Sequence, residues 1–388
     1  MYFNLNQTQL SIIDSVQNIM KNFDDDYWLQ CDKENKFPHK FYEEIASGGW
    51  LGICMPKQFG GTALGVSDAS IFMQKVSETG GGMAAASSIH INIFGPHPIV
   101  VYGNNKQKEK WLPPLISGKE KTCFGVTEPD AGLDTGKLKT FAKKINDGYL
   151  VNGQKIWTST AKIADKILLL ARTIPVEECK KNTDGLTLFY TELDRKKIEV
   201  KEISKMGRAA VDSNQIFIDN LEVPDFDRIG EEGKGFKYIL DSLNPERILI
   251  AAEALGIGKN ALSRAVKYAS DRIVFDRPIG KNQSIQHPLA ENWIELEAAE
   301  LLIAKAAYQY DNGQNAGGMA NAAKFFAAEA GFKAATQAVI TLGGMGYAKE
   351  YHVERLLRES LIPKLAPVSA QMILNYISER VLGLPKSY

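Results

Sequence analysis

Two short runs in the middle of the chain carry residues that suit a flat redox cofactor. The first, Val126–Gly132, reads V-T-E-P-D-A-G, and its turn residues let several backbone N–H groups converge on one point. The second, Ile156–Thr160, reads I-W-T-S-T and offers an aromatic wall beside three hydroxyls. A flat cofactor needs both a ring wall and short polar groups around its edge. Taken singly, each run is better explained as a surface turn followed by an ordinary strand.

Together, the two runs resemble the T-E-P-x-A-G and W-x-[TS] segments of the acyl-CoA dehydrogenase family. In that family the segments flank the isoalloxazine ring of FAD, so the resemblance implies FAD as the cofactor. It places six residues against FAD, namely Phe124, Val126, Thr127, Gly132, Trp157 and Ser159. A serine normally follows the first segment, but Leu133 stands there in this chain, which removes one hydroxyl from the implied phosphate or substrate contact.

Further matches to the family lie in the last third of the chain. Arg272, Phe275 and Gln283 match a segment whose Arg, Phe and Gln reach FAD, partly across a subunit boundary. An arginine supplies the fork of donors that a pyrophosphate accepts through two hydrogen bonds. Asp276 stands where the family usually has glycine, so we expect the local turn to differ.

Two more stretches of the chain match cofactor contacts of the family. Gly343 and Gly344 begin a G-G-x-G-[YF] run, which in the family approaches the adenosine half of FAD. Taken alone, a glycine turn between two helices explains this run equally well. Ser369 and Gln371 match the T-x-Q of a later loop that also faces FAD, whereas Ile340 replaces the glutamine that usually contacts adenine.

The reaction that the resemblance implies needs a catalytic base. A proton leaves the carbon next to a thioester carbonyl while a hydride passes from the next carbon to flavin N5, so a buried carboxylate must face the substrate. Many members carry this glutamate in a Y-E-G-T segment, where this chain has Pro367. A minority, including isovaleryl- and long-chain-type enzymes, carries it just before an arginine on the first long C-terminal helix. Glu246, followed by Arg247, is therefore the predicted base.

Helix formation alone offers a second explanation of Glu246. Asn244 can cap a helix and Pro245 can begin one, and the helix dipole favours a glutamate in the first turn. The dipole lowers the pKa of such a glutamate, so burial has to outweigh it if Glu246 is to act as a base near neutral pH. The resemblance and Pro367 favour the catalytic role. The implied substrate contacts are Leu133, Asn244, Arg247, Pro367 and Val368.

The patterns along the chain predict an α+β protein of three domains. Residues 1–120 show helical spacing of apolar residues, which predicts an N-terminal helical domain. Residues 121–230 show short alternating segments with hairpin signals at Asp147-Gly148 and Asn152-Gly153, which predict a small antiparallel β barrel or sandwich. Residues 231–388 predict a C-terminal helical bundle, with long helices over 247–271, 284–312 and 317–342.

Composition excludes several classes of function for this chain of 388 residues. Basic and acidic residues are equal at 46 each, which argues against a nucleic-acid or membrane-surface role. Four scattered cysteines indicate a reducing compartment, and we expect no membrane span and no signal peptide. A cytoplasmic location follows, or the mitochondrial matrix in a eukaryote. His90 and His97 lack clustered partners and are expected to pack rather than bind metal, so no metal site is predicted, and Arg208 is expected to be a solvated surface residue.

The resemblance implies an FAD-dependent acyl-CoA dehydrogenase that passes electrons to an electron-transfer flavoprotein and assembles as a homotetramer. Two alternatives stay open. One is a flavin oxidase or monooxygenase of the same fold that uses oxygen on a substrate without CoA, and the other is a catalytically silent flavoprotein subunit. Glu246 with Arg247 favours the dehydrogenase, whereas Leu133 and Ile340 are compatible with either alternative.

Overall fold

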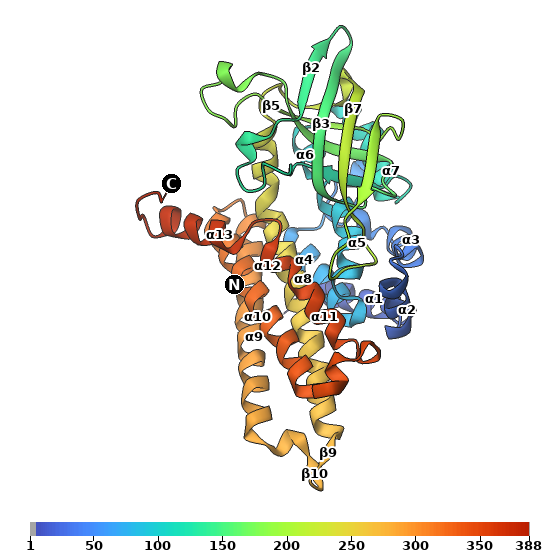
Figure 1. The fold of residues 1–388 in the computed structure, drawn as a ribbon, viewed down its shortest axis with the longest axis vertical. Coiled ribbons are helices and arrows are strands. Elements are labelled where there is room, and N and C mark those ends of the chain that lie inside the picture. The colour runs from blue at the N-terminus through green and yellow to red at the C-terminus, as the bar shows by residue number, and fades with distance from the viewer. Residues whose placement is uncertain (1–4, 388) are drawn as a thin grey trace.

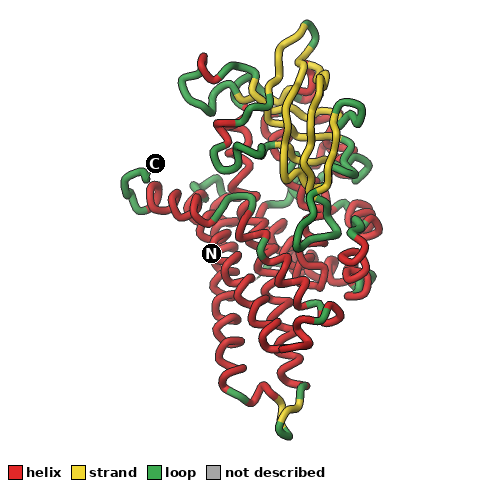
Figure 2. The backbone as a smooth tube through the Cα atoms, in the orientation of Figure 1, coloured by secondary structure: helices red, strands yellow, loops and turns green. Residues whose placement is uncertain are grey.

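The structure, a computed structural model, describes residues 5–387. A helical region, a sheet and a second helical region follow one another along the chain (Figure 1). The sheet lies at one end of the molecule, and long helices reach to the other end, where a short hairpin closes them (Figure 2). No helix between residues 5 and 387 has both the length and the apolar character needed to cross a membrane.

The first region consists of helices that pack beside the sheet and the later helices. They are α1 (Gln7–Met20), α2 (Asp25–Glu34), α3 (His39–Ser47), α4 (Val66–Val76), α5 (Gly82–Phe94), α6 (His97–Tyr102) and α7 (Asn105–Ile116). A capping box begins α7, because Asn104 and Gln107 exchange hydrogen bonds of 2.9 and 3.0 Å. The Gln107 side chain also donates to the carbonyls of Phe226 and Arg228, at 2.7 and 2.8 Å. These bonds fix α7 to the end of the middle region.

The middle region is one sheet of eight strands. The strands are β1 (Thr122–Gly125), β2 (Phe141–Ile145), β3 (Gly148–Ser159), β4 (Lys166–Arg172), β5 (Leu186–Glu192), β6 (Ile198–Glu202), β7 (Ser213–Pro224) and β8 (Arg228–Ile229). Their order is β6-β7-β3-β2-β4-β5-β8, and β1 pairs with β4. Most pairs are antiparallel as predicted, but β1 and β2 each pair with β4 in parallel.

One of the two predicted hairpin turns is confirmed. Asp147-Gly148 turns between β2 and β3, which pair in register from Ile145 opposite Gly148. The second prediction is wrong, because Asn152-Gly153 lies inside β3 at a shift of register between Val151 and Gly153. Gly153 has φ +152°, and a Cβ on it would lie 2.4 Å from Thr140 Oγ1. An Asn-Gly pair signals a permissive backbone, which serves a β-bulge as well as a turn.

The C-terminal region is built on one central helix. It consists of α8 (Gly235–Asp271), the hairpin of β9 (Ile273–Val274) and β10 (Arg277–Pro278), α9 (Gln283–Asp311), α10 (Gly317–Leu342), α11 (Val353–Ser360), α12 (Ile362–Leu365) and α13 (Ala370–Tyr376). Helix α8 packs against α10, α9 and α4. The α+β architecture predicted from the sequence is therefore confirmed.

The start of the first long C-terminal helix differs from the prediction. Helix α8 begins at Gly235 and continues through Pro245, so Asn244 is not its N-cap. A proline inside a helix removes one backbone hydrogen bond, and tertiary packing compensates here because Pro245 is buried. Glu246 consequently lies several turns inside the helix, beyond the reach of the dipole at its N-terminus.

Three apolar cores hold these elements together. The largest joins α1–α5 to the C-terminal helices. Strand β4 is buried on both faces: Leu168 and Leu170 belong to a core shared with α6 and α7, and Ile167 and Leu169 belong to a third core inside the sheet. The boundaries predicted near residues 120 and 230 fall in the connections from α7 to β1 and from β8 to α8.

Candidate active site

Glu246 lies at the wall of a narrow cavity between α5, α6, β1 and α8. Apolar side chains make most of this wall, namely Ile91, Phe94, Pro98, Phe124 and Ile239, and the polar side chains are His90, Ser242 and Glu246. Burial raises the pKa of Glu246, although His90 and Arg247 oppose the rise. A carboxyl group whose pKa is raised in an apolar cavity is suited to accept a proton near neutral pH.

The two cofactor runs predicted from the sequence are brought together beside β1. The Ile156 N–H donates to the carbonyl of Thr127 at 2.9 Å. Lys155 Nζ donates to the Val126 carbonyl at 3.1 Å and to Glu128 Oε1 at 2.8 Å. The turn and the strand therefore form one hydrogen-bonded unit, as the resemblance to the two family segments implied.

Glu128 is a buried anchor of this unit. Its carboxylate also accepts hydrogen bonds from the N–H groups of Lys139, at 2.6 Å, and Thr140, at 2.9 Å. Burial alone raises the pKa of a carboxyl group, but Lys155 and these N–H donors hold the pKa of Glu128 below its ordinary value. The ionised carboxylate thus fixes the turn that follows Thr127.

The surface of this unit fits the flat cofactor that the sequence predicted. Trp157 stands at the second register shift of β3, has φ +61°, and keeps 56% of its surface exposed. Among residues 5–387, the Thr127 N–H donates to no backbone carbonyl. Ser159 lies on the same strand, two residues beyond the indole. An exposed ring wall with polar groups beside it matches the requirements of an isoalloxazine ring.

Arg208 corrects a prediction and adds a residue to the site. It is not a solvated surface residue: its Nη2 donates to Ser159 Oγ at 2.9 Å and to Ser213 Oγ at 2.8 Å, and its Nη1 donates to Ser87 Oγ at 3.3 Å. These serines come from α5, β3 and β7. No spacing in the sequence could reveal this contact set, because its members are distant along the chain.

Several predicted FAD contacts lie far from Trp157 within one chain. Arg272, Phe275 and Gln283 lie at the hairpin of β9 and β10, at the opposite end of the molecule from β3 (Figure 1). Phe275 is 93% exposed. Phe275 and Asp276 have φ of +51° and +60°, so the aspartate adopts the left-handed backbone that a glycine adopts readily.

The glycine run after α10 is open to its surroundings. Gly343 has φ +60°, and a Cβ placed on Gly343 or Gly344 would meet no atom within 4 Å. Ile340, on the last turn of α10, is exposed. The backbone here is therefore accessible to a ligand.

Three of the predicted substrate contacts, Asn244, Arg247 and Leu133, lie in two different places. Arg247 Nη1 donates to Asn244 Oδ1 at 3.0 Å, so both residues adjoin Glu246 on α8. Leu133 and Gly132 are exposed on the turn after Thr127 and do not line the cavity of Glu246. The contact of Leu133 with substrate therefore stays a prediction.

The loop before α13 is held by a lysine that the sequence analysis did not single out. Lys324 is buried on α10, and its Nζ donates to the Val368 carbonyl at 2.7 Å, next to Pro367. Burial and the nearby Arg247 lower the pKa of Lys324 to about 8. Ser369 accepts a hydrogen bond from the Met372 N–H and caps α13, and Gln371 is exposed.

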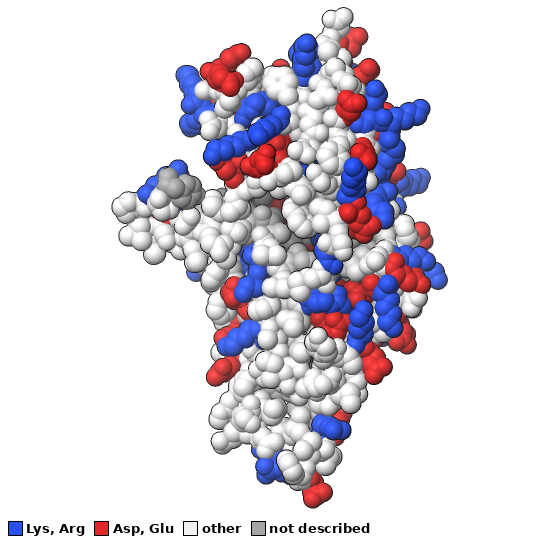
Figure 3. Space-filling view, viewed as in Figure 1, with Lys and Arg blue, Asp and Glu red and all other residues white. Residues whose placement is uncertain are grey.

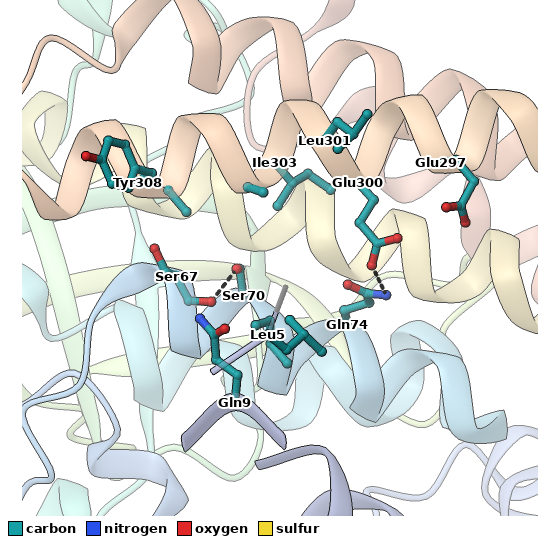
Figure 4. Close-up of a pocket in the computed structure, with 13 residues that line it drawn as sticks. Leu5, Gln9, Ser67, Ser70, Gln74, Glu297, Glu300, Leu301, Ile303 and Tyr308 are labelled. Carbon is teal, nitrogen blue, oxygen red and sulfur yellow. Dashed lines mark hydrogen bonds between the residues drawn. The ribbon is translucent and has the colours of Figure 1, made fainter. Parts of the chain in front are cut away.

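A second hollow, between α1, α4 and α9, lies apart from these residues. Figure 4 shows Gln74 directed towards Glu300, and the Gln74 Nε2 to Glu300 Oε1 distance is 3.3 Å. None of the site residues predicted from the sequence lines it. The hollow is therefore not part of the candidate active site.

These features define a class of protein. A carboxyl group with a raised pKa faces an apolar cavity. Phe124 lines that cavity and lies two residues before the Val126–Gly132 turn, which is hydrogen-bonded to the strand of Trp157. A base, an apolar cavity and a surface for a flat ring are the parts of a flavin-dependent oxidoreductase.

Comparisons with known proteins identify the family. Profiles of the acyl-CoA dehydrogenase N-terminal, middle and C-terminal domains match residues 6–119, 123–221 and 233–382. The chain belongs to the acyl-CoA dehydrogenase family, whose members are flavoprotein oxidoreductases.

Three relatives illustrate the similarity. The chain is 33% identical over 380 residues to the acyl-CoA dehydrogenase fadE12 of Mycobacterium bovis, covering 96% of each chain. It is 32% identical to the caffeyl-CoA reductase-Etf complex subunit CarC of Acetobacterium woodii, covering 91% of this chain and 92% of the relative. The solved structure of butyryl-CoA dehydrogenase from Megasphaera elsdenii is 30% identical, with a TM-score of 0.93 and coverage of 98% and 100%.

Proposed function

We propose that this protein removes two hydrogens from an acyl-CoA thioester, with Glu246 as the base that takes the proton next to the carbonyl. The observation that carries this proposal is the position of Glu246 in an apolar cavity shared with Phe124. FAD, when bound, supplies the acceptor for the hydride that leaves the neighbouring carbon.

Other residues of the chain are proposed to exclude water and to bind the thioester carbonyl. The apolar cavity wall excludes water from the thioester, which strengthens electrostatic interactions inside it. Pro367 has no N–H, so the N–H of Val368 is the proposed donor to the thioester carbonyl. Lys324 donates a hydrogen bond to the Val368 carbonyl and so holds this loop in place.

Cofactor binding is proposed to involve two copies of the chain. Thr127, Trp157 and Ser159 would hold the flavin ring from one copy, and Arg272, Phe275, Gln283, Gly343 and Gly344 would hold the other half of FAD from a second copy. Exposed apolar side chains on α9 support such an assembly, since Trp293 is 58% and Ile294 60% exposed. On the face shown in Figure 3, charged side chains gather around the sheet and the first helices, and the lower bundle shows few. A homotetramer satisfies these contacts by symmetry.

The proposed electron acceptor is an electron-transfer flavoprotein. Similarity over nearly the whole chain to a subunit of a caffeyl-CoA reductase-Etf complex supports this acceptor. Acyl chain length is set by the cavity around Phe94 and Ile239.

Anaerobic titration of the purified yellow protein with a panel of acyl-CoA thioesters tests the proposal. At least one thioester is expected to bleach the flavin, whereas the matching free acid is not. Electron-transfer flavoprotein is then expected to restore the flavin absorbance faster than dissolved oxygen does. A protein that takes up no FAD, or whose flavin no thioester bleaches, contradicts the dehydrogenase function, and faster recovery with oxygen would indicate an oxidase.

A further inference from the structure

A buried acid–histidine pair lies beside the proposed base. His90 Nδ1, on α5, is 2.6 Å from Glu253 Oε1, on α8. Only 8% of the His90 side chain and none of the Glu253 side chain is exposed. Glu253 follows Glu246 by seven residues, so both carboxyl groups project from one face of α8. His90 also lines the cavity of Glu246, so the ring that contacts Glu253 borders the same cavity as the proposed base.

The contacts of the pair favour the ionised form. Burial alone lowers the pKa of His90, but the Glu253 carboxylate raises it above its ordinary value. Glu253 Oε2 has no hydrogen-bond partner among the described residues, so within residues 5–387 this carboxyl group is hydrogen-bonded to His90 alone. A buried carboxylate beside a neutral imidazole is costly, whereas an imidazolium compensates its charge. With Nδ1–H donated to Glu253, the other ring nitrogen, Nε2, is left for the cavity.

Charged side chains of both signs face His90 and Glu246. His90 is faced by Glu253 and Glu246 from α8 and by Arg208 from the connection between β6 and β7. Glu246 is faced by His90, by Arg247 and, more weakly, by Glu253. The positive end of the His90–Glu253 pair is therefore the end that acts more strongly on Glu246.

We propose that His90, held by Glu253, is a positioning residue that keeps the Glu246 carboxylate ionised and so sets the lowest pH at which this base works. The proposal rests on the proposed function of Glu246. It adds to that function two residues that the family resemblance did not assign to the site.

The first test replaces the ion pair with a neutral pair in the FAD-loaded protein. In His90→Gln/Glu253→Gln the amides can still meet, which avoids an unpaired buried charge. The rate constant of flavin reduction by an acyl-CoA is measured by stopped flow across pH. The low-pH limb of the profile of rate constant against pH is expected to move up by about one pH unit. Flavin reduction is then roughly tenfold slower at pH values on that limb and unchanged well above it.

One control variant and two contrary results accompany this test. His39→Gln, an exposed histidine at the start of α3, is expected to leave the pH profile unchanged. An unmoved limb in the double variant overturns the proposal. So does a loss of rate that is equal at every pH, because that result indicates a structural role for the pair.

A second test needs no substrate. The chain has five histidines, so ¹³Cε1-histidine labelling of the FAD-loaded protein gives few NMR signals, and His90→Gln identifies that of His90. The His90 signal is expected to titrate above the ordinary histidine pKa near 6.5, and in Glu253→Gln to titrate below it. A His90 that is neutral at pH 7 while acyl-CoA still bleaches the flavin overturns this inference alone. Failure of every acyl-CoA to bleach the wild-type flavin overturns the proposed function and this inference together.

Discussion

At Glu246, two opposite effects act on one carboxyl group. Burial in the cavity raises its pKa, and His90 and Arg247 lower it. The net rise means that burial is the larger effect, as a general base near neutral pH requires. The helix dipole, which offered the competing explanation of this residue, has little influence because α8 starts at Gly235.

Glu246→Gln is expected to slow flavin reduction by an acyl-CoA roughly 10²–10⁴-fold, because the amide keeps the shape and loses the basicity. FAD content and acyl-CoA affinity are expected to stay at wild-type values. In the wild-type protein the rate constant should rise with pH through a pKa above the ordinary value of 4.5, since only the ionised form accepts a proton. Stopped-flow measurement across pH checks both expectations.

The matched control is Glu178→Gln, which changes an exposed glutamate away from the cavity and should alter no rate. Pro367→Glu in the Glu246→Gln background is expected to restore part of the activity, because many family members carry their base at that position. Wild-type reduction by the Glu246→Gln variant would show that the base lies elsewhere.

Trp157→Ala is expected to weaken FAD binding at least tenfold, because the indole is the proposed wall of the flavin site. Since 56% of the side chain is exposed, the free energy of unfolding of the apoprotein should change by less than about 0.5 kcal/mol. Fluorescence titration of apoprotein with FAD measures the affinity, and Trp157→Phe should retain most of it. An unchanged affinity in Trp157→Ala would remove the indole from the cofactor site.

At the scale of elements, β3 is shaped by two register shifts, after Val151 and after Lys155. The second shift turns Trp157 out of the sheet while Lys155, two residues earlier, points inward to Glu128. One strand thus carries both the exposed ring and the buried ion pair that anchors the neighbouring turn.

Lys155→Met is expected to destabilise the protein by about 3–5 kcal/mol, because it leaves the buried Glu128 carboxylate without its ammonium partner. Lys155→Met/Glu128→Gln removes both charges and should recover most of the loss. Urea unfolding at pH 7 measures the difference, and equal stability of wild type and Lys155→Met would contradict a buried ion pair.

The pH dependence of this pair has a definite sign. The folded pKa of Glu128 is lowered, so its stabilising contribution is present above the ordinary pKa of 4.5 and is lost as pH falls through the folded value. The stability advantage of wild type over Lys155→Met should therefore shrink in acid.

At the scale of the whole molecule, the predicted FAD contacts lie at opposite ends of one chain (Figure 1). Trp157 belongs to the sheet, and Phe275 belongs to the far hairpin. A single cofactor meets both only if a second copy brings its hairpin towards the sheet of the first.

Light scattering is therefore expected to give a mass of a multiple of 42.9 kDa, with four copies as the proposed number. Trp293→Asp/Ile294→Asp, which places charges on the exposed face of α9, should lower this mass and release FAD. Lys180→Asp, on the exposed connection between β4 and β5, is a control for altered charge and is expected to change neither the mass nor the FAD content. A monomer that retains FAD tightly would contradict the assembly.

The sequence by itself determined the order of helical and sheet regions, because hydrophobic periodicity and turn chemistry are local properties. It also indicated the two flavin runs and Glu246, since their residues are adjacent along the chain. Only the tertiary structure decided the continuous path of α8, the three serines around Arg208 and the partnership of His90 with Glu253. Burial and charge at each of these residues come from segments distant in sequence, and no local pattern specifies which segments those are.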